Sequence, residues 1–409
     1  MQIGQFLSKK PLIFLVCSLH SLLLVFLTFW WMNTTFMYED EYLLIRLTSV
    51  IKRIALGIEE KPDKSRFLFV GVSWDKALTD KVDESGLPVG NQAITDREKL
   101  ARFLNVLNQK PDNHRFLVID IFFKDSSPAD SALQSEFYRT KNYLVSYHKN
   151  EDESPDFPIF TCETGLSDYE SSEEGLLGIS AGGFAKYKML QGDSLQTLPL
   201  LMYRQLYKAS FEKGSVVHFI NNKPVFPSFV IDHRIRNYDL FEAADSLQYD
   251  KAYLGELLYL PNEAIWELTK DRIVIVGDFE DRDIHHTIYG SMPGPLILVN
   301  AFLALESGDA FVHWGFVLLL FIGFCLVSYR CFYNRDFVLG YLLGRFSKAF
   351  NIKRSISAGF LNYFMYFLLI SIISYFLFDI HLSVLFLSIY LEIVSRGLGY
   401  VKRRLEILN

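Results

Sequence analysis

The stretch "RIVIVGDFEDRDIHH", residues 272–286, joins a strand-like apolar run to a dense group of ionisable side chains. The run at 273–276 predicts a short β-strand that stops at Gly277. Acids and histidines follow it directly: Asp278, Glu280, Asp281, Asp283, His285 and His286. A nearly continuous apolar strand indicates a parallel sheet covered by helices, and α/β proteins place their binding sites just beyond the carboxyl ends of such strands.

Further apolar runs of strand length alternate with helix-like segments along the chain. Thr95 and Glu98 have the spacing of a capping box at the start of one of these helices. Strands are predicted at 66–73, 115–123, 142–148, 215–220 and 272–277, and helices at 38–58, 95–109, 127–140, 198–211 and 296–309. The order predicts an α/β fold with a mostly parallel sheet flanked by helices.

Three of the predicted strands carry acids at or just after their carboxyl ends. Asp75 follows the first strand, Asp120 lies within the second, and the acidic segment 278–286 follows the last. Because the carboxyl ends of parallel strands meet at one edge of a sheet, we expect these groups on the same edge.

Four apolar segments lie outside this alternating region, at residues 11–32, 311–329, 358–378 and 380–394. The first three reach or approach the roughly 20 residues that cross a bilayer, and the fourth is shorter and contains Glu392. The first could be a signal peptide, but it is long and lacks a small-x-small cleavage pattern, so we expect a retained anchor. The chain as a whole is 50% hydrophobic, yet 22% charged, which fits a membrane part joined to a water-exposed part.

Lysine and arginine positions predict the orientation. All basic clusters around the four spans fall on one side, which the positive-inside rule makes cytoplasmic. The expected order is an N-terminal anchor (1–32), an extracytoplasmic α/β domain (33–310), a second transmembrane helix (311–333), a basic amphipathic cytoplasmic loop (334–357), the third and fourth transmembrane helices (358–395), and a basic cytoplasmic tail (396–409). Both termini then lie in the cytoplasm and the large domain lies in the periplasm.

Charge and cysteine content narrow the chemistry of the domain. Residues 33–310 hold 29 Lys and Arg against 43 Asp and Glu, a net charge of −14, whereas the membrane part carries +8. So acidic a domain argues against nucleic-acid binding. Cys162 is the one cysteine between residues 33 and 310, so no intrachain disulfide framework is expected there.

The acidic segment raises the question of a metal. Asp281, Asp283 and His285 alternate and would face one way in an extended loop, and this donor set suits zinc or manganese. His285 and His286 are adjacent, however, and the chain has no His-x-x-x-His, cysteine pair or EF-hand spacing. We therefore expect no metal and no cofactor, and Asp281, Asp283 and His285 are the ligands of the alternative.

Nucleophilic catalysis finds less support in the chain. The stretch "GISAG" (178–182) has the Gly-x-Ser-x-Gly spacing but is interpreted as a glycine-rich turn, and the acidic neighbourhood of Cys162 raises the pKa expected for its thiol. In the membrane part, Glu392 and His381 are the conspicuous polar groups. Glu392 precedes Arg396 by four residues, which favours an ion pair near the cytoplasmic end of the fourth span. We expect no catalytic residue and no enzymatic activity.

The order of segments resembles that of bacterial CHASE type 2 sensory proteins, in which an anchor, an exported α/β domain and three closing spans follow one another. Four stretches carry the resemblance: "FLFVGVSWDKAL" (67–78), "GLPVGNQAITDREKLARFLNVL" (86–107), "FLVIDIFFKDSSPADSALQSEF" (116–137) and "DRIVIVGDFEDRDIHHTIYGSMPGPLILVNAFLALESGD" (271–309). It implies a small helix after Asp75. The sequence departs from the family where "LPVGNQ" replaces the Trp-Pro-Arg element, and no cyclase or kinase segment is expected after the last span.

The resemblance and the topology together predict a non-enzymatic sensory or binding protein of the inner membrane of a Gram-negative bacterium. Its domain would bind a small periplasmic ligand or an envelope protein, and the spans would pass the bound state to a separate protein partner or within a homo-oligomer. The predicted contact residues are Asp75, Asp120, Asp283 and Asn300. The alternatives are a structural scaffold of an envelope complex and a periplasmic metal-dependent hydrolase.

Overall fold

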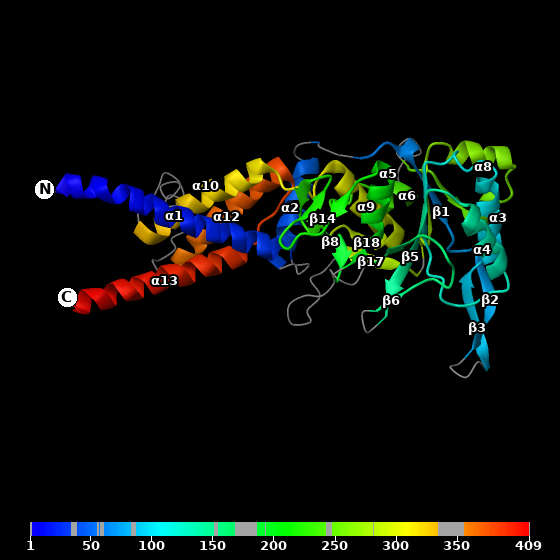
Figure 1. Ribbon diagram of the computed structural model, residues 1–409, viewed down its shortest axis with the longest axis horizontal. Coiled ribbons are helices and arrows are strands. Elements are labelled where there is room, and N and C mark those ends of the chain that lie inside the picture. Colours follow the sequence, from blue (N-terminus) through cyan, green and yellow to red (C-terminus); the bar gives the residue numbers. More distant parts are fainter. Residues whose placement is uncertain are drawn as a thin grey trace.

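A computed structural model describes residues 2–33, 39–54, 57, 61–82, 87–150, 154–167, 186–192, 194–242, 248–280, 282–333 and 356–408. The molecule is elongated, with a helical bundle at one end and an α/β domain at the other (Figure 1). Both chain ends lie at the end of the bundle that is far from the domain. Three parts of the sequence discussed above lie outside the described residues: the stretch 168–185, Asp281, and residues 334–355 of the predicted amphipathic loop.

The domain is built on a parallel-rich sheet, as the sequence predicts. Its central strands are buried along their whole length, which explains their continuous apolar character. In spatial order the sheet contains β15 (Lys251–Tyr253), β1 (Phe67–Gly71), β16 (Ile273–Gly277), β4 (Phe116–Asp120) and β5 (Tyr143–Lys149), with β7 (Thr164–Leu166) parallel and β6 (Pro155–Asp156) antiparallel to β5.

The last of the predicted strands, β16, lies in the middle of the sheet between β1 and β4. Gly277 is level with Gly71 on one side and with Asp120 on the other. A side chain at Gly277 would approach Pro295 Cγ to 2.5 Å, so glycine lets the helix that begins beside it pack closely. This central position brings the acidic segment between the two acids predicted on neighbouring strands.

Helices cover both faces of the sheet. Alternate strand residues point to opposite sides, so Phe67 and Phe69 face one core and Leu68 and Val70 face the other. The first core is closed by α5 (Leu198–Tyr207) and α9 (Gly294–Ser307). The second is closed by α3 (Arg97–Asn108), α4 (Asp130–Arg139), α7 (Leu254–Leu257) and α8 (Asn262–Thr269).

The start of α3 differs from the sequence prediction. Asp96, not Thr95, is the N-cap, and its carboxylate accepts hydrogen bonds from the backbone amides of Glu98 and Lys99, both at 3.1 Å. Thr95 is instead the last residue of β3 and pairs with Lys76. The capping-box prediction was wrong by one residue because an acid next to Thr95 takes the same role.

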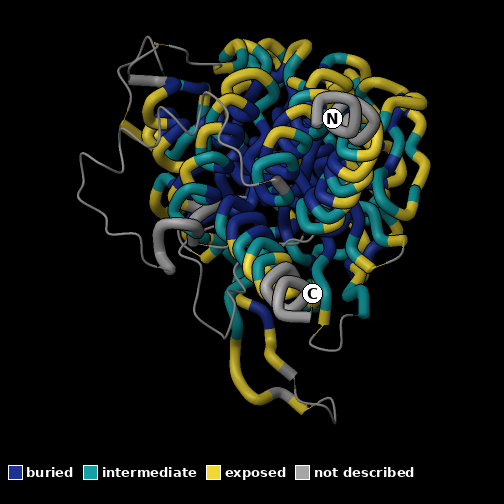
Figure 2. Tube along the Cα trace, turned by 90° about the vertical axis from the view of Figure 1, so that its left-hand side faces the viewer, coloured by how far each residue is buried: buried dark blue, intermediate teal, exposed yellow. Residues whose placement is uncertain are grey.

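A projecting hairpin replaces the small helix that the resemblance implied after Asp75. It consists of β2 (Lys76–Val82) and β3 (Pro88–Thr95), which pair antiparallel. Figure 2 shows it extending, largely exposed, from the body of the domain. Cross-strand backbone bonds satisfy here the groups that a helix would have satisfied internally.

Several short β-elements fill the space between the main sheet and the bundle. The predicted strand 215–220 is shorter than expected, as β12 (His218–Ile220), and pairs antiparallel with β11 (Phe211–Glu212) and β13 (Lys223–Val225) outside the main sheet. The other pairs are β8 (Lys186–Lys188) with β14 (Ser228–Val230), β9 (Leu190–Gln191) with β10 (Leu195–Gln196), and β17 (Ile284–Thr287) with β18 (Gly290–Pro293). A short helix, α6 (Asn237–Phe241), follows β14.

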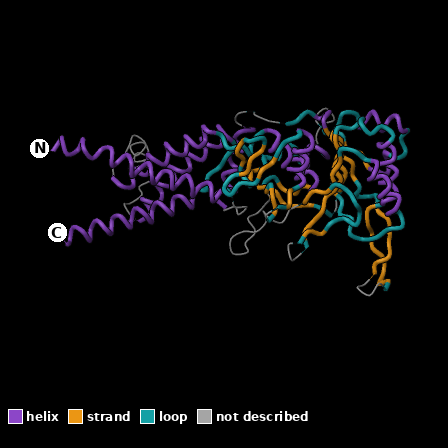
Figure 3. Tube along the Cα trace, in the orientation of Figure 1, coloured by secondary structure: helices purple, strands orange, loops and turns teal. Residues whose placement is uncertain are grey.

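The bundle consists of α1 (Gln2–Met32), α10 (Trp314–Tyr333), α12 (Ile356–Phe378) and α13 (Val384–Leu408) (Figure 3). By length and composition, their segments Pro11–Met32, Trp314–Phe332, Phe360–Phe378 and Val384–Val401 are apolar enough to cross a membrane. The four predicted spans are thus confirmed as membrane-spanning candidates.

A further helix, α2 (Glu39–Ile54), lies where the bundle meets the domain (Figure 1). The sequence predicts a longer amphipathic helix, 38–58, whose apolar positions include Leu43, Ile45, Leu47 and Val50. In the structure Ile45 is buried, whereas Leu43, Leu47 and Val50 are exposed. The buried residues of α2 are Leu44, Ile45, Thr48, Ser49 and Lys52, so hydrogen-bonding neighbours as well as apolarity select what is buried.

Candidate functional site

Asp75 lies at the carboxyl edge of the sheet, in the turn between β1 and β2. Its side chain accepts hydrogen bonds from Lys99 Nζ at 2.6 Å and from the Gly255 amide at 2.9 Å. Gly255 must lack a side chain, because a Cβ atom there would lie 2.5 Å from Asp75 Oδ1. Asp75 is therefore a buried, ion-paired carboxylate that joins the β1 turn to α3 and α7.

Asp278 follows β16 and takes part in a second ion pair on this edge. Its carboxylate accepts hydrogen bonds from Ser73 Oγ at 2.7 Å and Lys76 Nζ at 3.2 Å, and from the backbone amide of Glu280 at 3.2 Å. The contacts connect the acidic segment to the turn after β1 and to the first residue of the projecting hairpin. Sequence reasoning saw Asp278 as one acid of a run and could not assign it this partner.

Glu280 is the centre of a third group. It accepts hydrogen bonds from Lys251 Nζ and Tyr253 OH, and from Trp74 Nε1 at 2.8 Å. Burial alone would raise the pKa of Glu280, but the hydrogen bonds from Lys251 and Tyr253 hold it below its usual value. Burial and the hydrogen bond to Glu280 raise the pKa of Tyr253 to about 12. Glu280 is thus a stable anion and Tyr253 a stable donor.

The other predicted acids have separate surroundings. Asp120 is buried at the end of β4 and accepts a hydrogen bond from Ser167 Oγ at 3.1 Å. Asp283 lies 2.8 Å from His285 Nε2, and its carboxylate rests on Gly294, where a Cβ atom would be 2.1 Å from Asp283 Oδ2. Asp283 therefore shapes the entry into α9, where the helix dipole favours an anion.

Asn300 lies in the core and not on the edge. Its side chain accepts from the Ile235 amide at 2.9 Å and donates to the carbonyls of Ile235 and Leu296 at 2.7 and 2.9 Å. Only 1% of Asn300 is exposed. The structure thus groups Asp75, Asp120 and the acidic segment at one edge, and it separates Asn300 from them by placing it inside α9.

The edge offers little to a metal. Within the described part of the chain, no three His, Cys, Asp or Glu side chains converge as a metal would require. Asp283 and His285, the described members of the alternative ligand set, bind each other. Burial raises the pKa of the Cys162 thiol to about 12, so the direction predicted from the sequence holds, although burial and not the neighbouring acids is the cause.

A second polar region lies where the domain meets the bundle, and α2 forms its centre. On one side of α2, Ile45 packs against Ile288, and Ser49 Oγ lies 2.6 Å from Tyr289 OH. Ile288 and Tyr289 form the turn between β17 and β18, directly after the acidic segment. This side of α2 therefore contacts the end of the segment on which the sequence analysis centred.

The other side of α2 contacts the bundle. Leu44 belongs to the bundle core, Thr48 Oγ1 lies 2.9 Å from His381 Nε2, and Lys52 forms a 3.0 Å ion pair with Asp379. Asp379 and His381 lie in the connection between α12 and α13. Burial lowers the pKa of His381 to about 3, so its ring is neutral at physiological pH. The spacing of Leu44, Thr48 and Lys52 by four is the sequence signal for this face, which apolarity alone missed.

Buried charges also lie at the connection between α9 and α10. Arg234 and Asp309 form a bidentate ion pair at 2.8 and 3.1 Å, with side chains 5% and 9% exposed. Asp232 lies beside it, and burial raises the pKa of that carboxyl to about 6. Within the fourth span, Arg396 Nε lies 2.8 Å from Glu392 Oε1, which confirms the predicted pair.

Comparisons with family models, curated proteins and solved structures found no match for this chain.

Proposed function

We propose that the protein is a non-enzymatic receptor of a bacterial inner membrane. Its α/β domain recognises a ligand or an envelope protein in the periplasm, and α2 passes the bound state to the transmembrane helices and through them to a separate partner. The observation that carries this proposal is the position of α2, whose residues 45 and 49 contact the β17–β18 turn while residues 44, 48 and 52 contact the bundle.

The recognition end of this route is the carboxyl edge. Its ion pairs use lysines on separate elements: Lys99 on α3, Lys76 on β2 and Lys251 on β15. A bound anion would compete with Asp75, Asp278 or Glu280 for these lysines, and a bound cation would compete with the lysines. Either event alters the acidic segment, which continues directly into β17.

The route from the edge to α2 runs through packed side chains. Phe279 lies between Asp278 and Glu280 in the chain and packs into the core against Phe69, with ring centroids 5.6 Å apart. Residues 282–283 then lead into the β17–β18 hairpin, whose turn contacts α2. A ligand shifts such a system only by binding one arrangement better than the other.

A protein is the occupant that the exposed surface favours. Trp74 and Tyr259 are 71% and 92% exposed, and Leu78 on the projecting hairpin is 74% exposed. Tryptophan and tyrosine are enriched in protein interfaces, and isolated two-stranded hairpins are marginally stable in water. This observation equally supports the scaffold alternative, in which the same face docks permanently in an envelope complex.

Hydrogen exchange of the full chain in lipid nanodiscs tests the coupling. Lys251→Met removes one donor from Glu280, and we expect faster exchange both at the edge and at residues 379–383. Adding Ile45→Ala, which removes the contact with Ile288, should confine the change to the edge. Lys124→Met is the matched control, because Lys124 pairs with Asp156 on the surface near β6. Changes confined to the edge in Lys251→Met alone would contradict the proposal.

The orientation has a separate test. Tyr259→Cys places a thiol at a position that is 92% exposed, and a membrane-impermeant maleimide should label it in intact spheroplasts. Labelling that appears only after permeabilisation would place the domain in the cytoplasm. Val401→Cys, at the end of the fourth span nearest the C-terminus, is the reciprocal control and should react only after permeabilisation.

A further inference from the structure

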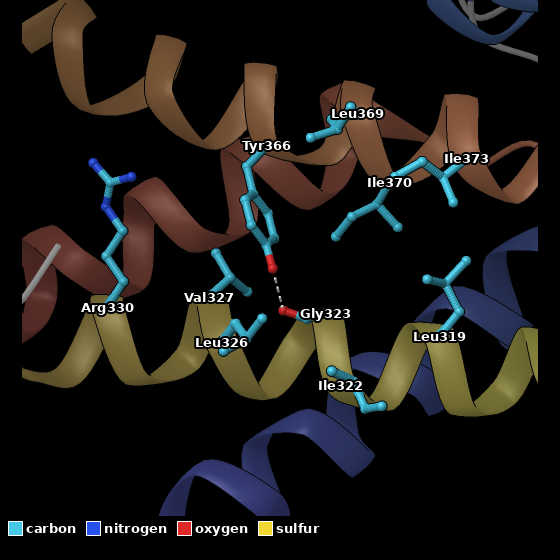
Figure 4. Close-up of a pocket in the computed structure, with 10 residues that line it drawn as sticks. All are labelled: Leu319, Ile322, Gly323, Leu326, Val327, Arg330, Tyr366, Leu369, Ile370 and Ile373. Atoms are coloured by element: carbon cyan, nitrogen blue, oxygen red, sulfur yellow. Dashed lines mark hydrogen bonds between the residues drawn. The ribbon is translucent and has the colours of Figure 1, made fainter. Parts of the chain in front are cut away.

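The bundle has a lateral groove between α10 and α12 that no part of the proposed route uses. Its cavity of about 260 Å³ is lined by one face of each helix, from Leu319 to Arg330 on α10 and from Tyr366 to Ile373 on α12 (Figure 4). The lining residues recur every three or four positions, as expected of a continuous stripe on each helix.

The groove is apolar except at one end. Tyr366 directs its hydroxyl inward but donates it to the Gly323 carbonyl at 2.8 Å, so its polar atom is already satisfied (Figure 4). Gly323 permits this close packing, because a Cβ atom there would lie 2.8 Å from Ile370 Cδ1. Arg330 is the one charged residue of the lining, and Figure 4 shows it at the end opposite Leu319.

The length of the groove identifies what fits it. From Leu319 to Arg330 the helix rises about 16 Å at 1.5 Å per residue, close to the roughly 15 Å of hydrocarbon in one leaflet of a 30 Å core. Arg330 comes just before the end of the candidate span Trp314–Phe332, where lipid headgroups begin. A helix from a second copy would need a face that runs through both leaflets.

We propose that this groove is a binding site for an anionic phospholipid. One acyl chain lies between α10 and α12, and the phosphate accepts hydrogen bonds from the Arg330 guanidinium, whose planar donors match phosphate oxygens. The guanidinium lies 5.9 Å from the Tyr363 ring centroid, so an aromatic face supports it beside the groove. The lipid belongs to the leaflet at the end of the bundle where both chain ends lie.

Native mass spectrometry of the detergent-purified full chain tests the headgroup. Phosphatidylglycerol should bind about fivefold more tightly than phosphatidylcholine with the same acyl chains, the preference expected of one arginine at a membrane surface. Arg330→Gln should abolish the preference. Arg396→Gln, which alters an exposed arginine on α13, should keep it. Equal affinity of the unaltered chain for the two lipids would overturn the proposal.

A second pair of variants tests the acyl chain. Leu326→Trp fills the groove and should weaken binding of both lipids at least tenfold, whereas Leu318→Trp, on a lipid-facing part of α10 outside the groove, should leave it unchanged. Thermal unfolding checks that both variants fold. Unchanged lipid binding in Leu326→Trp overturns the proposal, and so does a dimer that dissociates in this variant without loss of lipid, which would assign the groove to a second copy.

Discussion

The carboxyl edge of the sheet and the junction around α2 both contain ion pairs, and the Lys99–Asp75 pair of the edge differs in its surroundings from the Arg234–Asp309 pair of the junction. At the edge, Lys99 is 38% exposed beside Asp75, so water reaches one partner. At the junction, Arg234 and Asp309 are both almost fully buried and bind each other through two hydrogen bonds. A half-exposed pair can exchange its partner for water or a ligand at low cost, whereas breaking a buried pair strands a charge.

This difference fits the roles proposed for the two regions, which are recognition at the carboxyl edge and transmission at the junction. A recognition surface has to exchange contacts with whatever binds, and single lysine contacts allow that. A junction that passes a change onward has to stay packed while it moves as a unit, and the buried bidentate pair of Arg234 with Asp309 favours that. Substitutions test this difference. They should lower the free energy of unfolding strongly at the junction and weakly at the edge.

The largest effect is expected for Arg234→Met. It leaves the Asp309 carboxylate buried without its bidentate partner, which should lower the free energy of unfolding by about 3–5 kcal/mol. Thermal or denaturant unfolding of the full chain in detergent measures this. The double variant Arg234→Met with Asp309→Leu should recover most of the loss, and a single variant that costs less than about 1 kcal/mol would erase the contrast between the regions.

A pH-dependent effect is expected for Asp232→Asn. Burial, with repulsion from Asp309 and Asp379, raises the Asp232 pKa from 3.8 to about 6 against the attraction of Lys52 and Arg234. Because the native carboxyl keeps its proton to higher pH than the unfolded chain does, its contribution to stability is complete below pH 3.8 and is lost as pH rises through about 6.

The asparagine variant lacks this loss. Its free energy of unfolding should equal that of the unaltered protein below pH 3.8 and should exceed it above pH 6 by up to about 3 kcal/mol. His381 titrates over a neighbouring range but is present in both proteins, so the difference between their unfolding curves isolates Asp232. Parallel curves across this range would show that Asp232 is ionised in the folded protein.

A smaller effect is expected for Lys99→Met at the edge. Asp75 keeps the hydrogen bond from the Gly255 amide, and water replaces part of the lost contact, so the cost should be about 1–2 kcal/mol. Unfolding under the same conditions as for Arg234→Met gives the direct ratio. A loss as large as that of Arg234→Met would mean that the edge is as rigid as the junction.

The smallest effect is expected for Lys124→Met. Lys124 is 60% exposed and pairs with Asp156 on the surface, so its loss should leave the free energy of unfolding unchanged within the error of the measurement. This variant sets the lower end of the scale on which the other three are placed, and a loss of stability as large as that of Lys99→Met would contradict that scale.

Local sequence patterns predicted most of the main helices and strands. The elements that they missed show which features depend on other parts of the chain. The buried strands β1, β4 and β16 were predictable, because a strand that is apolar on both faces is stable only where helices cover both faces of its sheet. The cap of α3 was misplaced because Thr95 and Asp96 are both good caps, and only the pairing of Thr95 with Lys76 decides between them. The expected small helix became β2 because β3 supplies a partner strand that the local sequence does not reveal.

The candidate site was predicted in position but not in its contacts. Asp75, Asp120 and the acidic segment share an edge because their strands are parallel, which sequence order already indicates. Their hydrogen-bond partners could not be predicted from the sequence, because Lys99, Lys251 and Ser167 belong to other elements of the chain. Asn300 lies inside α9, away from that edge, and its position was not predictable because a polar side chain inside an apolar helix looks the same in sequence whether it meets a ligand or a neighbouring backbone.

By itself, the amino-acid sequence determined the apolar spans, the parallel strands and the acidic character of the domain, because each depends on runs and periodicities of neighbouring residues. The tertiary structure alone decided that β16 lies at the centre of the sheet, which face of α2 is buried, and which cation meets which anion. Those outcomes depend on contacts between residues that are hundreds of positions apart, such as Lys52 with Asp379, and no local pattern encodes such a pairing.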